Sequence, residues 1–139
     1  GLLVSPLGLP CTPPPWGVLS GIDLSTGEIV WRRTHGTTKD LAPGGLALKF
    51  GTPTIGGPII TKGGLIFIGA SMDDYLRAYN VETGREVWKG RLPAGGQATP
   101  MTYEYQGRQF VVIAAGGHGS SGTKICDHIV AFALSNTEN

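Results

Sequence analysis

The apolar residues of this chain occur in short runs, and glycine, proline or a polar turn bounds each run. The two longest runs are residues 65–70 and 110–115. A helix that spans a membrane needs about 20 consecutive apolar residues, whereas a buried strand needs only four to eight. These runs therefore predict strands.

An internal repeat is visible by eye. Residues 21–31 read GIDLSTGEIVW, residues 78–88 read AYNVETGREVW 57 positions later, and a truncated third copy starts at Ala131, 53 positions after Ala78. The copies share an Asp or Asn, a Thr-Gly pair and a Trp. The Asp or Asn side chain can bond the backbone two residues on, and the glycine supplies a positive φ. Each copy therefore predicts a β-hairpin.

Strand signals before the second hairpin complete a unit of four antiparallel strands, which is the blade of a β-propeller. The predicted fold class is all-β, an incomplete β-propeller of about two to three blades. A half blade is expected at 15–35, a complete blade at 53–92 and a blade lacking its outer strand at 95–134. The predicted strands are 16–23, 28–34, 54–61, 65–70, 75–81, 86–92, 98–105, 109–115 and 128–134.

So few blades cannot close a ring, and an open propeller exposes sheet edges. Residues 1–139 are therefore expected to be a fragment whose edges are covered by the rest of a propeller or by self-association. In this arrangement Trp31 and Trp88 are expected to pack between neighbouring blades, because an indole buries a large area.

Composition agrees with this reading. The chain has 23 Gly and 10 Pro among 139 residues, only 15% charged residues and a net charge of +1. No basic run is present, which argues against nucleic acid as a partner. Cys11 and Cys126 are separated by 114 residues and lack C-x-x-C spacing. Neither a zinc site nor a redox pair is predicted, no metal ligand is assigned, and the pairing of the two cysteines stays open.

The repeat, with the segment GGLIFIGASMDDYLRAY before its second copy, resembles the tryptophan-docking motif of pyrroloquinoline quinone (PQQ)-dependent dehydrogenases. Segments 7–17, 91–103 and 114–124 resemble the membrane-bound glucose dehydrogenase branch, which includes quinate/shikimate and polyol dehydrogenases. The resemblance implies that residues 1–139 form the C-terminal part of an eight-bladed propeller. It places the general base, most ligands of PQQ and of its Ca²⁺ or Mg²⁺, and the membrane anchor upstream, so no catalytic residue is assigned here.

The implied parent protein oxidises an aldose such as glucose to the lactone with PQQ and passes electrons to ubiquinone. The implied location is the periplasmic face of a bacterial inner membrane, and the fragment alone is expected to be inactive. Two alternatives stay open: a quinate/shikimate or polyol dehydrogenase of the same family, and a non-catalytic propeller scaffold or assembly module.

Propeller ligands bind where the loops of one face surround the central channel. Asp73 and Asp74 lie on such a loop. The resemblance selects Asp73 as a neighbour of the quinone and its cation, and Asp74 is expected to be a solvated rim charge. His118, between glycines on the matching loop of the next blade, is assigned to the cofactor and substrate pocket by the resemblance, although a lone loop histidine is more often simply solvated.

Three further residues are assigned to cofactor binding. Lys124 could meet a carboxylate of the quinone, against the simpler view of a surface lysine. Gln97 and Thr99 lead into an innermost strand and could touch the cofactor, although packing is the stronger reason for the glycines beside them. His35 and His128 receive no role.

Overall fold

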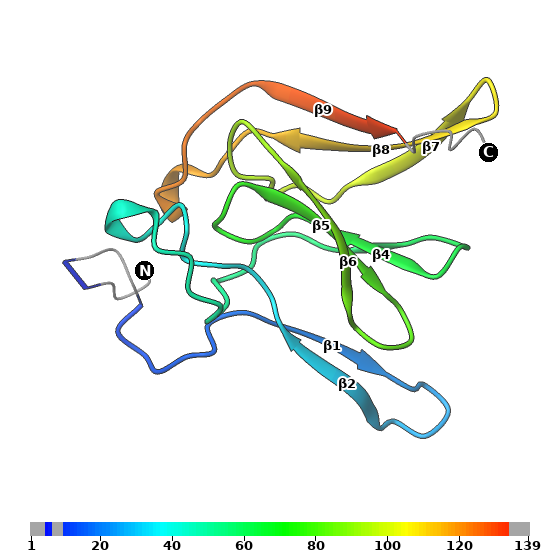
Figure 1. Ribbon diagram of the computed structural model, residues 1–139, viewed down its shortest axis with the longest axis horizontal. Helices are drawn as coiled ribbons and strands as arrows, with labels where there is room; N and C mark the ends of the chain where they lie inside the picture. Colours follow the sequence, from blue (N-terminus) through cyan, green and yellow to red (C-terminus); the bar gives the residue numbers. More distant parts are fainter. Residues whose placement is uncertain (1–4, 7–9, 134–139) are drawn as a thin grey trace.

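The computed structural model describes residues 5–6 and 10–133, and nine strands within them form three separate antiparallel sheets (Figure 1). The first sheet pairs β1 (Val18–Ile22) with β2 (Ile29–Thr34). The second has the order β3 (Ile59–Ile60), β4 (Leu65–Ile68), β5 (Tyr75–Asn80) and β6 (Glu86–Arg91). The third has the order β7 (Met101–Tyr105), β8 (Arg108–Ala115) and β9 (His128–Ala133).

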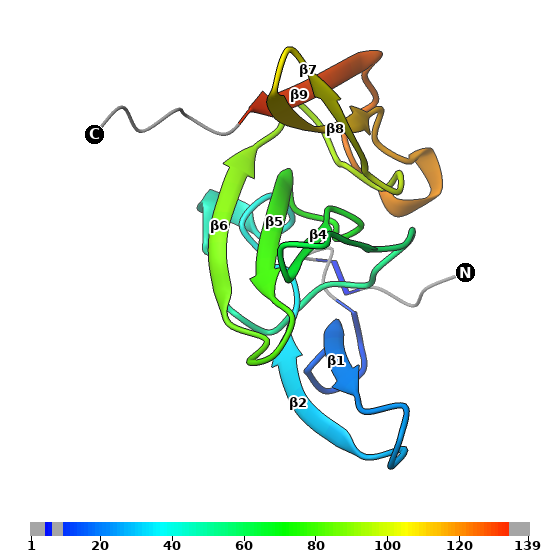
Figure 2. The same cartoon turned by 90° about the vertical axis from the view of Figure 1, so that its right-hand side faces the viewer.

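The sheets follow one another along an arc, with the first sheet at one end and the third at the other (Figure 2). Two short 3₁₀ turns, Pro43–Gly45 and Gly119–Ser121, interrupt the loops. The predicted fold class is confirmed: the chain has a two-stranded, a four-stranded and a three-stranded sheet of antiparallel strands. Residue 134, the last of the predicted strand 128–134, lies outside the described residues.

The two complete hairpins repeat each other in register as well as in sequence. Gly21 pairs with Trp31 in the first sheet and Ala78 pairs with Trp88 in the second, and the register shifts at the next residue in both. The turns also match: Asp23 Oδ1 accepts from the Ser25 amide at 2.8 Å, as Asn80 Oδ1 accepts from the Glu82 amide at 3.0 Å. The glycines that end these turns have φ of +74° and +65°. The side-chain cap and the positive φ predicted from the pattern are both present.

Several strands are shorter than predicted, and two of them begin directly after a proline. The expected strand 54–61 contributes only Ile59–Ile60, and the expected strand 98–105 begins at Met101. Pro58 and Pro100 stand immediately before these starts. Proline has no amide hydrogen to donate to a ladder, and Gly56 and Gly57 before Pro58 add chain entropy without packing area.

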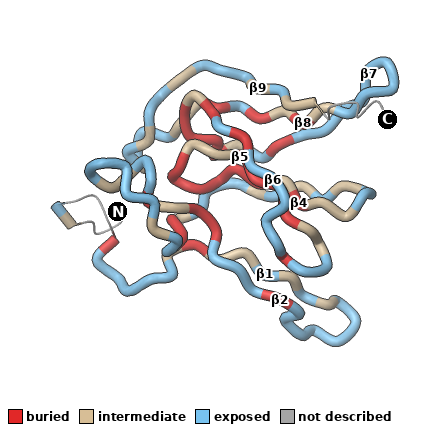
Figure 3. The backbone as a smooth tube through the Cα atoms, in the orientation of Figure 1, coloured by how far each residue is buried: buried red, intermediate tan, exposed pale blue. Residues whose placement is uncertain are grey.

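The hydrophobic core consists of two clusters, each between adjacent sheets. The first contains Trp31, Ile66, Ile68, Ala70 and Tyr79. The second contains Leu76, Leu92, Val111, Ile113 and Ala115, with Phe67, Ala98, Val130 and Phe132 packed against it. Side chains alternate across a strand, so β4 and β5 supply both clusters from opposite faces. Figure 3 accordingly shows the buried residues gathered in and around the middle sheet, with the hairpin tips exposed.

Trp31 joins the first sheet to the second, as predicted. Its indole is 7% exposed, and its Nε1 donates to the carbonyl of Val81 at 2.8 Å. A Cβ added at Gly84 would lie 2.4 Å from the Trp31 ring, so only glycine lets the turn approach the indole this closely. The Thr-Gly turn is thus both a hairpin turn and a docking surface.

Candidate functional site

Asp73 lies in the loop between β4 and β5 and is completely buried. Its Oδ1 accepts from Ser71 Oγ at 2.6 Å and from Arg77 at 2.7 Å. Its Oδ2 accepts from the amide and hydroxyl of Thr37 at 2.7 and 2.8 Å and from Arg77 at 2.5 Å. The carboxylate therefore accepts five hydrogen bonds and ties the segment after β2 to the second sheet.

The charge state of Asp73 follows from these partners. Burial raises the pKa of the carboxyl, but the hydrogen bonds and positive charge of Arg77, with the Ser71 and Thr37 hydroxyls, outweigh burial and lower it. Asp73 is therefore an ionised, fully hydrogen-bonded carboxylate paired with a buried guanidinium. Its assignment as a cofactor neighbour stays a prediction.

Gln97 lies close to the Asp73 loop and is 8% exposed. Its Nε2 donates to the Ser71 carbonyl at 3.3 Å, but its Oε1 is buried without a hydrogen-bond partner among the described residues. A Cβ added at Gly95 would lie 2.5 Å from this oxygen, so the glycine is what makes room for the Gln97 amide. A buried acceptor without a donor is costly, and such a group calls for a ligand or a water.

The loop that carries His118 and Lys124 is attached to the Gln97 segment. The amide of Gly117 donates to the Gly95 carbonyl at 2.9 Å, and Lys124 Nζ donates to the Pro93 carbonyl at 3.2 Å. His118 is exposed, and its Nδ1 lies 2.9 Å from Ser120 Oγ. The structure thus brings Asp73, Gln97, Lys124 and the His118 loop to one end of the second and third sheets.

Thr99 is placed differently. It is exposed, and its hydroxyl accepts from the Gly57 amide at 3.2 Å, which joins the start of the third sheet to the inner segment of the second. No described contact links it to the Asp73 and Gln97 network.

Asp74, beside Asp73, belongs to a second group of charges at the rim. Its side chain is only 14% exposed, so it is not the solvated charge that the sequence predicted. Arg91 makes two bonds to Asp40, at 2.7 and 2.6 Å, and lies 3.5 Å from Asp74. Burial and the neighbouring Asp40 charge raise the pKa of Asp74, whereas the Arg91 hydrogen bonds lower the pKa of Asp40. Two adjacent carboxyls are thereby held at different proton affinities.

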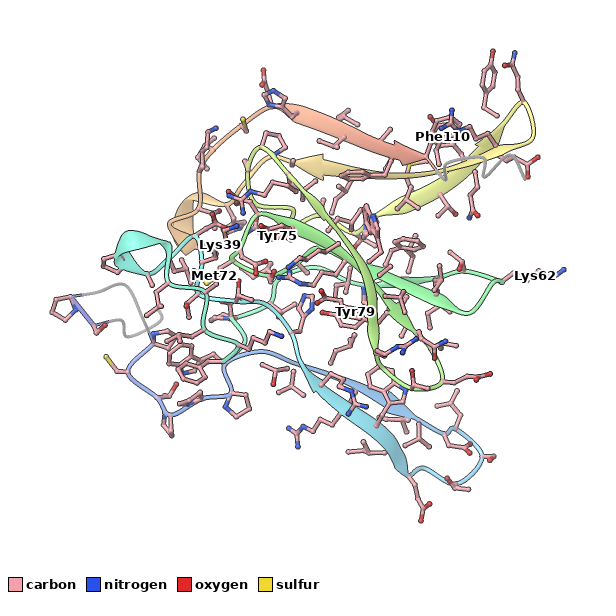
Figure 4. The ribbon with its side chains drawn as sticks, in the orientation of Figure 1. Lys39, Lys62, Met72, Tyr75, Tyr79 and Phe110 are labelled. Carbon is pink, nitrogen blue, oxygen red and sulfur yellow. The ribbon has the colours of Figure 1, made fainter. Side chains whose placement is uncertain are left out.

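Tyr75 completes this rim (Figure 4). Lys39 Nζ donates to its hydroxyl at 2.7 Å, and the cationic groups of Lys39, Arg77, Lys89 and Arg91 lie 4.8–5.4 Å from its ring centroid. The Lys39 hydrogen bond lowers the pKa of the phenol. The rim is therefore a compact, charge-rich surface next to Asp73.

Sequence reasoning missed the partners that define this region. Arg77 was visible as a cation inside the apolar strand 75–80, which signals a buried counter-ion. No feature of the amino-acid sequence pointed to Thr37 or to the His35–Tyr79 pair. His35 is 1% exposed, and its two ring nitrogens each lie 2.9 Å from a partner, the Tyr79 hydroxyl and the Gly69 carbonyl. Because a carbonyl only accepts, Nε2 donates to Gly69 and Nδ1 accepts from Tyr79.

Curated relatives match nearly the whole chain. It is 56% identical over 135 residues to the quinoprotein glucose dehydrogenase of Escherichia coli K12, with 94% of the chain and 17% of the relative covered. It is 44% identical over 137 residues to the quinate/shikimate dehydrogenase (quinone) of Acinetobacter baylyi, with the same coverage of 94% and 17%. The chain thus spans about a sixth of the length of these relatives.

A solved structure and a family model give the same result. A quinohemoprotein alcohol dehydrogenase from Pseudomonas putida HK5 superposes with a TM-score of 0.64 and 24% identity, covering 88% of this chain and 17% of that one, which shows the shared fold. The family model described as the β-propeller domain of glucose, ethanol and alcohol dehydrogenases matches residues 1–111. Membership of this family implies PQQ and a metal ion as cofactors. The repeated blades, the docked indole and these matches together show that the chain belongs to the PQQ-dependent dehydrogenase β-propeller family.

Proposed function

We propose that this chain supplies part of the propeller of a PQQ-dependent dehydrogenase that oxidises an aldose such as glucose to its lactone. The high identity to a protein named quinoprotein glucose dehydrogenase supports this choice over the less similar quinate/shikimate relative. We assign the activity and its general base to a longer protein, because the chain covers only 17% of the length of its glucose dehydrogenase relatives.

The observation that carries the proposal is the unpaired Gln97 Oε1. The Gln97 amide packs against Gly95, and its Nε2 bonds the Ser71 carbonyl, while Lys124 is tied to the Pro93 carbonyl of the same segment. An N–H or O–H donor of the bound cofactor, or a water that bridges to it, would satisfy Gln97 Oε1. The residues present therefore fit the cofactor that the family implies.

The chain's own residues would bind and orient. Bound PQQ and its divalent cation supply two-electron oxidation of the hydroxyl-bearing carbon of the substrate. Gln97 would fix one polar edge of the cofactor, and Asp73 would act as a positioning residue, since it holds Ser71, whose carbonyl accepts from Gln97 Nε2. Lys124 would contribute charge, and His118 hydrogen bonding, at the rim. Thr99, in the segment before β7, would line the channel.

We place the electron acceptor and the location by the same family argument: ubiquinone, at the periplasmic face of a bacterial inner membrane. No helix among residues 5–6 and 10–133 is long and apolar enough to cross a bilayer. The glucose dehydrogenase relatives come from bacteria, which supports the bacterial part of this assignment.

The test is PQQ titration of the longer protein that carries this sequence, read by the absorbance change of the cofactor. The Gln97→Ala variant is compared with Gln109→Ala, an exposed strand residue of the third sheet. Loss of one hydrogen bond should raise the PQQ Kd of Gln97→Ala about tenfold, while Gln109→Ala binds as the wild type. Equal affinity of both variants would remove Gln97 from the site.

The reaction is tested on the same reconstituted protein with Ca²⁺ or Mg²⁺ and an artificial electron acceptor. Glucose should be oxidised with a higher kcat/KM than quinate or glycerol. Preference for quinate or glycerol would move the assignment to that branch of the family. Failure of the wild type to bind PQQ at all would favour a scaffold.

A further inference from the structure

Three consecutive residues after the His118 loop bring three kinds of metal-binding atom together. Cys126 Sγ lies 3.0 Å from His128 Nδ1, and the same nitrogen lies 3.7 Å from Asp127 Oδ1. All three donor atoms lie within 4.8 Å of one another. A thiol, an imidazole and a carboxylate therefore converge on one point at the surface.

The backbone around this cluster is held in place. The Cys126 amide donates to the Gly116 carbonyl at 3.0 Å, and His128 pairs with Ala115 as the first residue of β9. The other side of the loop is closed by the His118 amide, which donates to Thr123 Oγ1 at 2.7 Å. The cluster is thus built on a strand start and a closed loop, which limits the order that a ligand would have to impose.

The arrangement does not suit a Cys-His-Asp catalytic triad. In a triad the base faces the nucleophile with one ring nitrogen, and the carboxylate orients the ring from the other. Here Sγ and Oδ1 both lie near Nδ1. Donors that converge on one side of the imidazole favour a shared cation over a proton relay.

We propose that Cys126 Sγ, His128 Nδ1 and an Asp127 carboxylate oxygen bind one Zn²⁺, with water as the fourth ligand. Thiolate, imidazole and carboxylate together suit Zn²⁺, whereas Ca²⁺ and Mg²⁺ prefer oxygen ligands alone. Tetrahedral bonds of about 2.3 Å to sulfur and 2.0–2.1 Å to nitrogen place those two atoms roughly 3.5 Å apart. Small side-chain rotations reach that separation from 3.0 Å.

The surface position leaves room for the fourth ligand. The side chains of His128 and Asp127 are 56% and 103% exposed. The chain spaces the cysteine and histidine as C-x-H, without the second cysteine pair of a zinc finger. In an extended segment, residues two apart point to the same side, so this spacing can still converge on one ion.

The test uses Co²⁺ as a spectroscopic probe of the metal-free protein, without PQQ. One equivalent of Co²⁺ per chain should produce a near-ultraviolet thiolate-to-cobalt charge-transfer band, and Zn²⁺ should displace it. Cys126→Ser should abolish the band, and His128→Asn should weaken Co²⁺ binding at least tenfold. Cys11→Ser, at the exposed second cysteine, is the matched control and should keep the band.

Several results would overturn the proposal: no thiolate band in the wild type, a band that survives in Cys126→Ser, or one Co²⁺ shared by two chains on size-exclusion chromatography. Far-UV circular dichroism shows that each variant is folded. The readout is independent of the proposed dehydrogenase, because an ion held by oxygen ligands at a cofactor site gives no thiolate band. A protein that binds no PQQ can still pass this test, and a functional dehydrogenase can fail it.

Discussion

At the interface between the first and second sheets Trp31 is 7% exposed and hydrogen-bonded to Val81, whereas at the next interface Trp88 is 39% exposed. Trp88 lies edge-on to Phe132, with ring centroids 5.0 Å apart. The two indoles occupy the same position of the repeat, 57 residues apart. The same tryptophan therefore reaches different depths at two neighbouring interfaces.

A second matched pair differs in chemistry. His35 and Tyr79 form a buried hydrogen bond at the first interface. At the second, the same repeat positions hold Leu92, 57 residues after His35, and Phe132, 53 residues after Tyr79. Both belong to the apolar cluster between the second and third sheets. At the second interface leucine and phenylalanine replace both members of the hydrogen-bonded pair. Neither a histidine nor a tyrosine is therefore buried at these positions without its partner.

Buried polar contacts distinguish one interface between repeated blades from the next. An apolar contact tolerates many partners of similar size, whereas a buried donor and acceptor stabilise only the arrangement in which they meet. The first interface also carries the Asp73 bonds to Thr37, so its polar groups specify one docking geometry. Three substitutions and a change of pH test whether the two interfaces differ in this way.

Trp31→Ala should have the largest effect. Removing a buried indole and its hydrogen bond should lower the free energy of unfolding by about 3–5 kcal/mol. Trp88→Ala should cost roughly half as much, because that ring is already partly solvated. Urea unfolding followed by circular dichroism measures both, and equal losses would contradict the contrast between the interfaces.

Asp73→Asn should be next. It leaves the Arg77 guanidinium buried without its main counter-ion and should cost about 3 kcal/mol. Glu104→Gln on the exposed β7 is the control and should change the free energy of unfolding by less than about 0.5 kcal/mol. A neutral effect of Asp73→Asn in urea unfolding would mean that the buried ion pair does not stabilise the fold.

Tyr79→Phe should cost about 1–2 kcal/mol, because it leaves the buried His35 Nδ1 without a donor. The double variant His35→Leu with Tyr79→Phe copies the residues of the second interface. It should lose less stability than the sum of the two single variants, by about 1 kcal/mol. Additive losses in a double-mutant cycle would show that the pair is not energetically coupled.

Acid pH should give the smallest effect. Burial lowers the pKa of His35 below its ordinary value of 6.5, and the Arg77 charge lowers it further, against the Gly69 hydrogen bond and the Asp73 charge. The unfolded chain then binds a proton that the folded chain does not, so stability should be constant above about pH 6.5 and fall as the pH drops below it. His35→Leu should flatten this part of the profile. A wild-type profile that is flat from pH 7 to pH 5 would exclude the contribution of His35.

The repeat made the hairpins predictable because its signals are local: an Asx cap, a positive-φ glycine and a tryptophan at constant spacing. The hairpins formed at the residues that carry these signals. The length of β3 was overestimated, because Pro58 interrupts the ladder. The candidate site was harder to predict from the sequence. Gln97 was named from its position beside two glycines, but its unpaired oxygen depends on how Ser71 packs against it. Cys126 and His128 were passed over because their spacing matches no metal motif.

The repeat unit, a four-stranded antiparallel blade with its turns, and the family of the chain can both be recognised from the amino-acid sequence. Those features depend on residues a few positions apart and on their recurrence. Three features depend on packing in space: Asp73 accepts from Thr37 36 residues away, His35 meets Tyr79 44 residues away, and Trp31 docks more deeply than Trp88. These contacts join different blades, and the strength of a buried polar contact is set by distance and desolvation, which the order of residues along the chain does not contain.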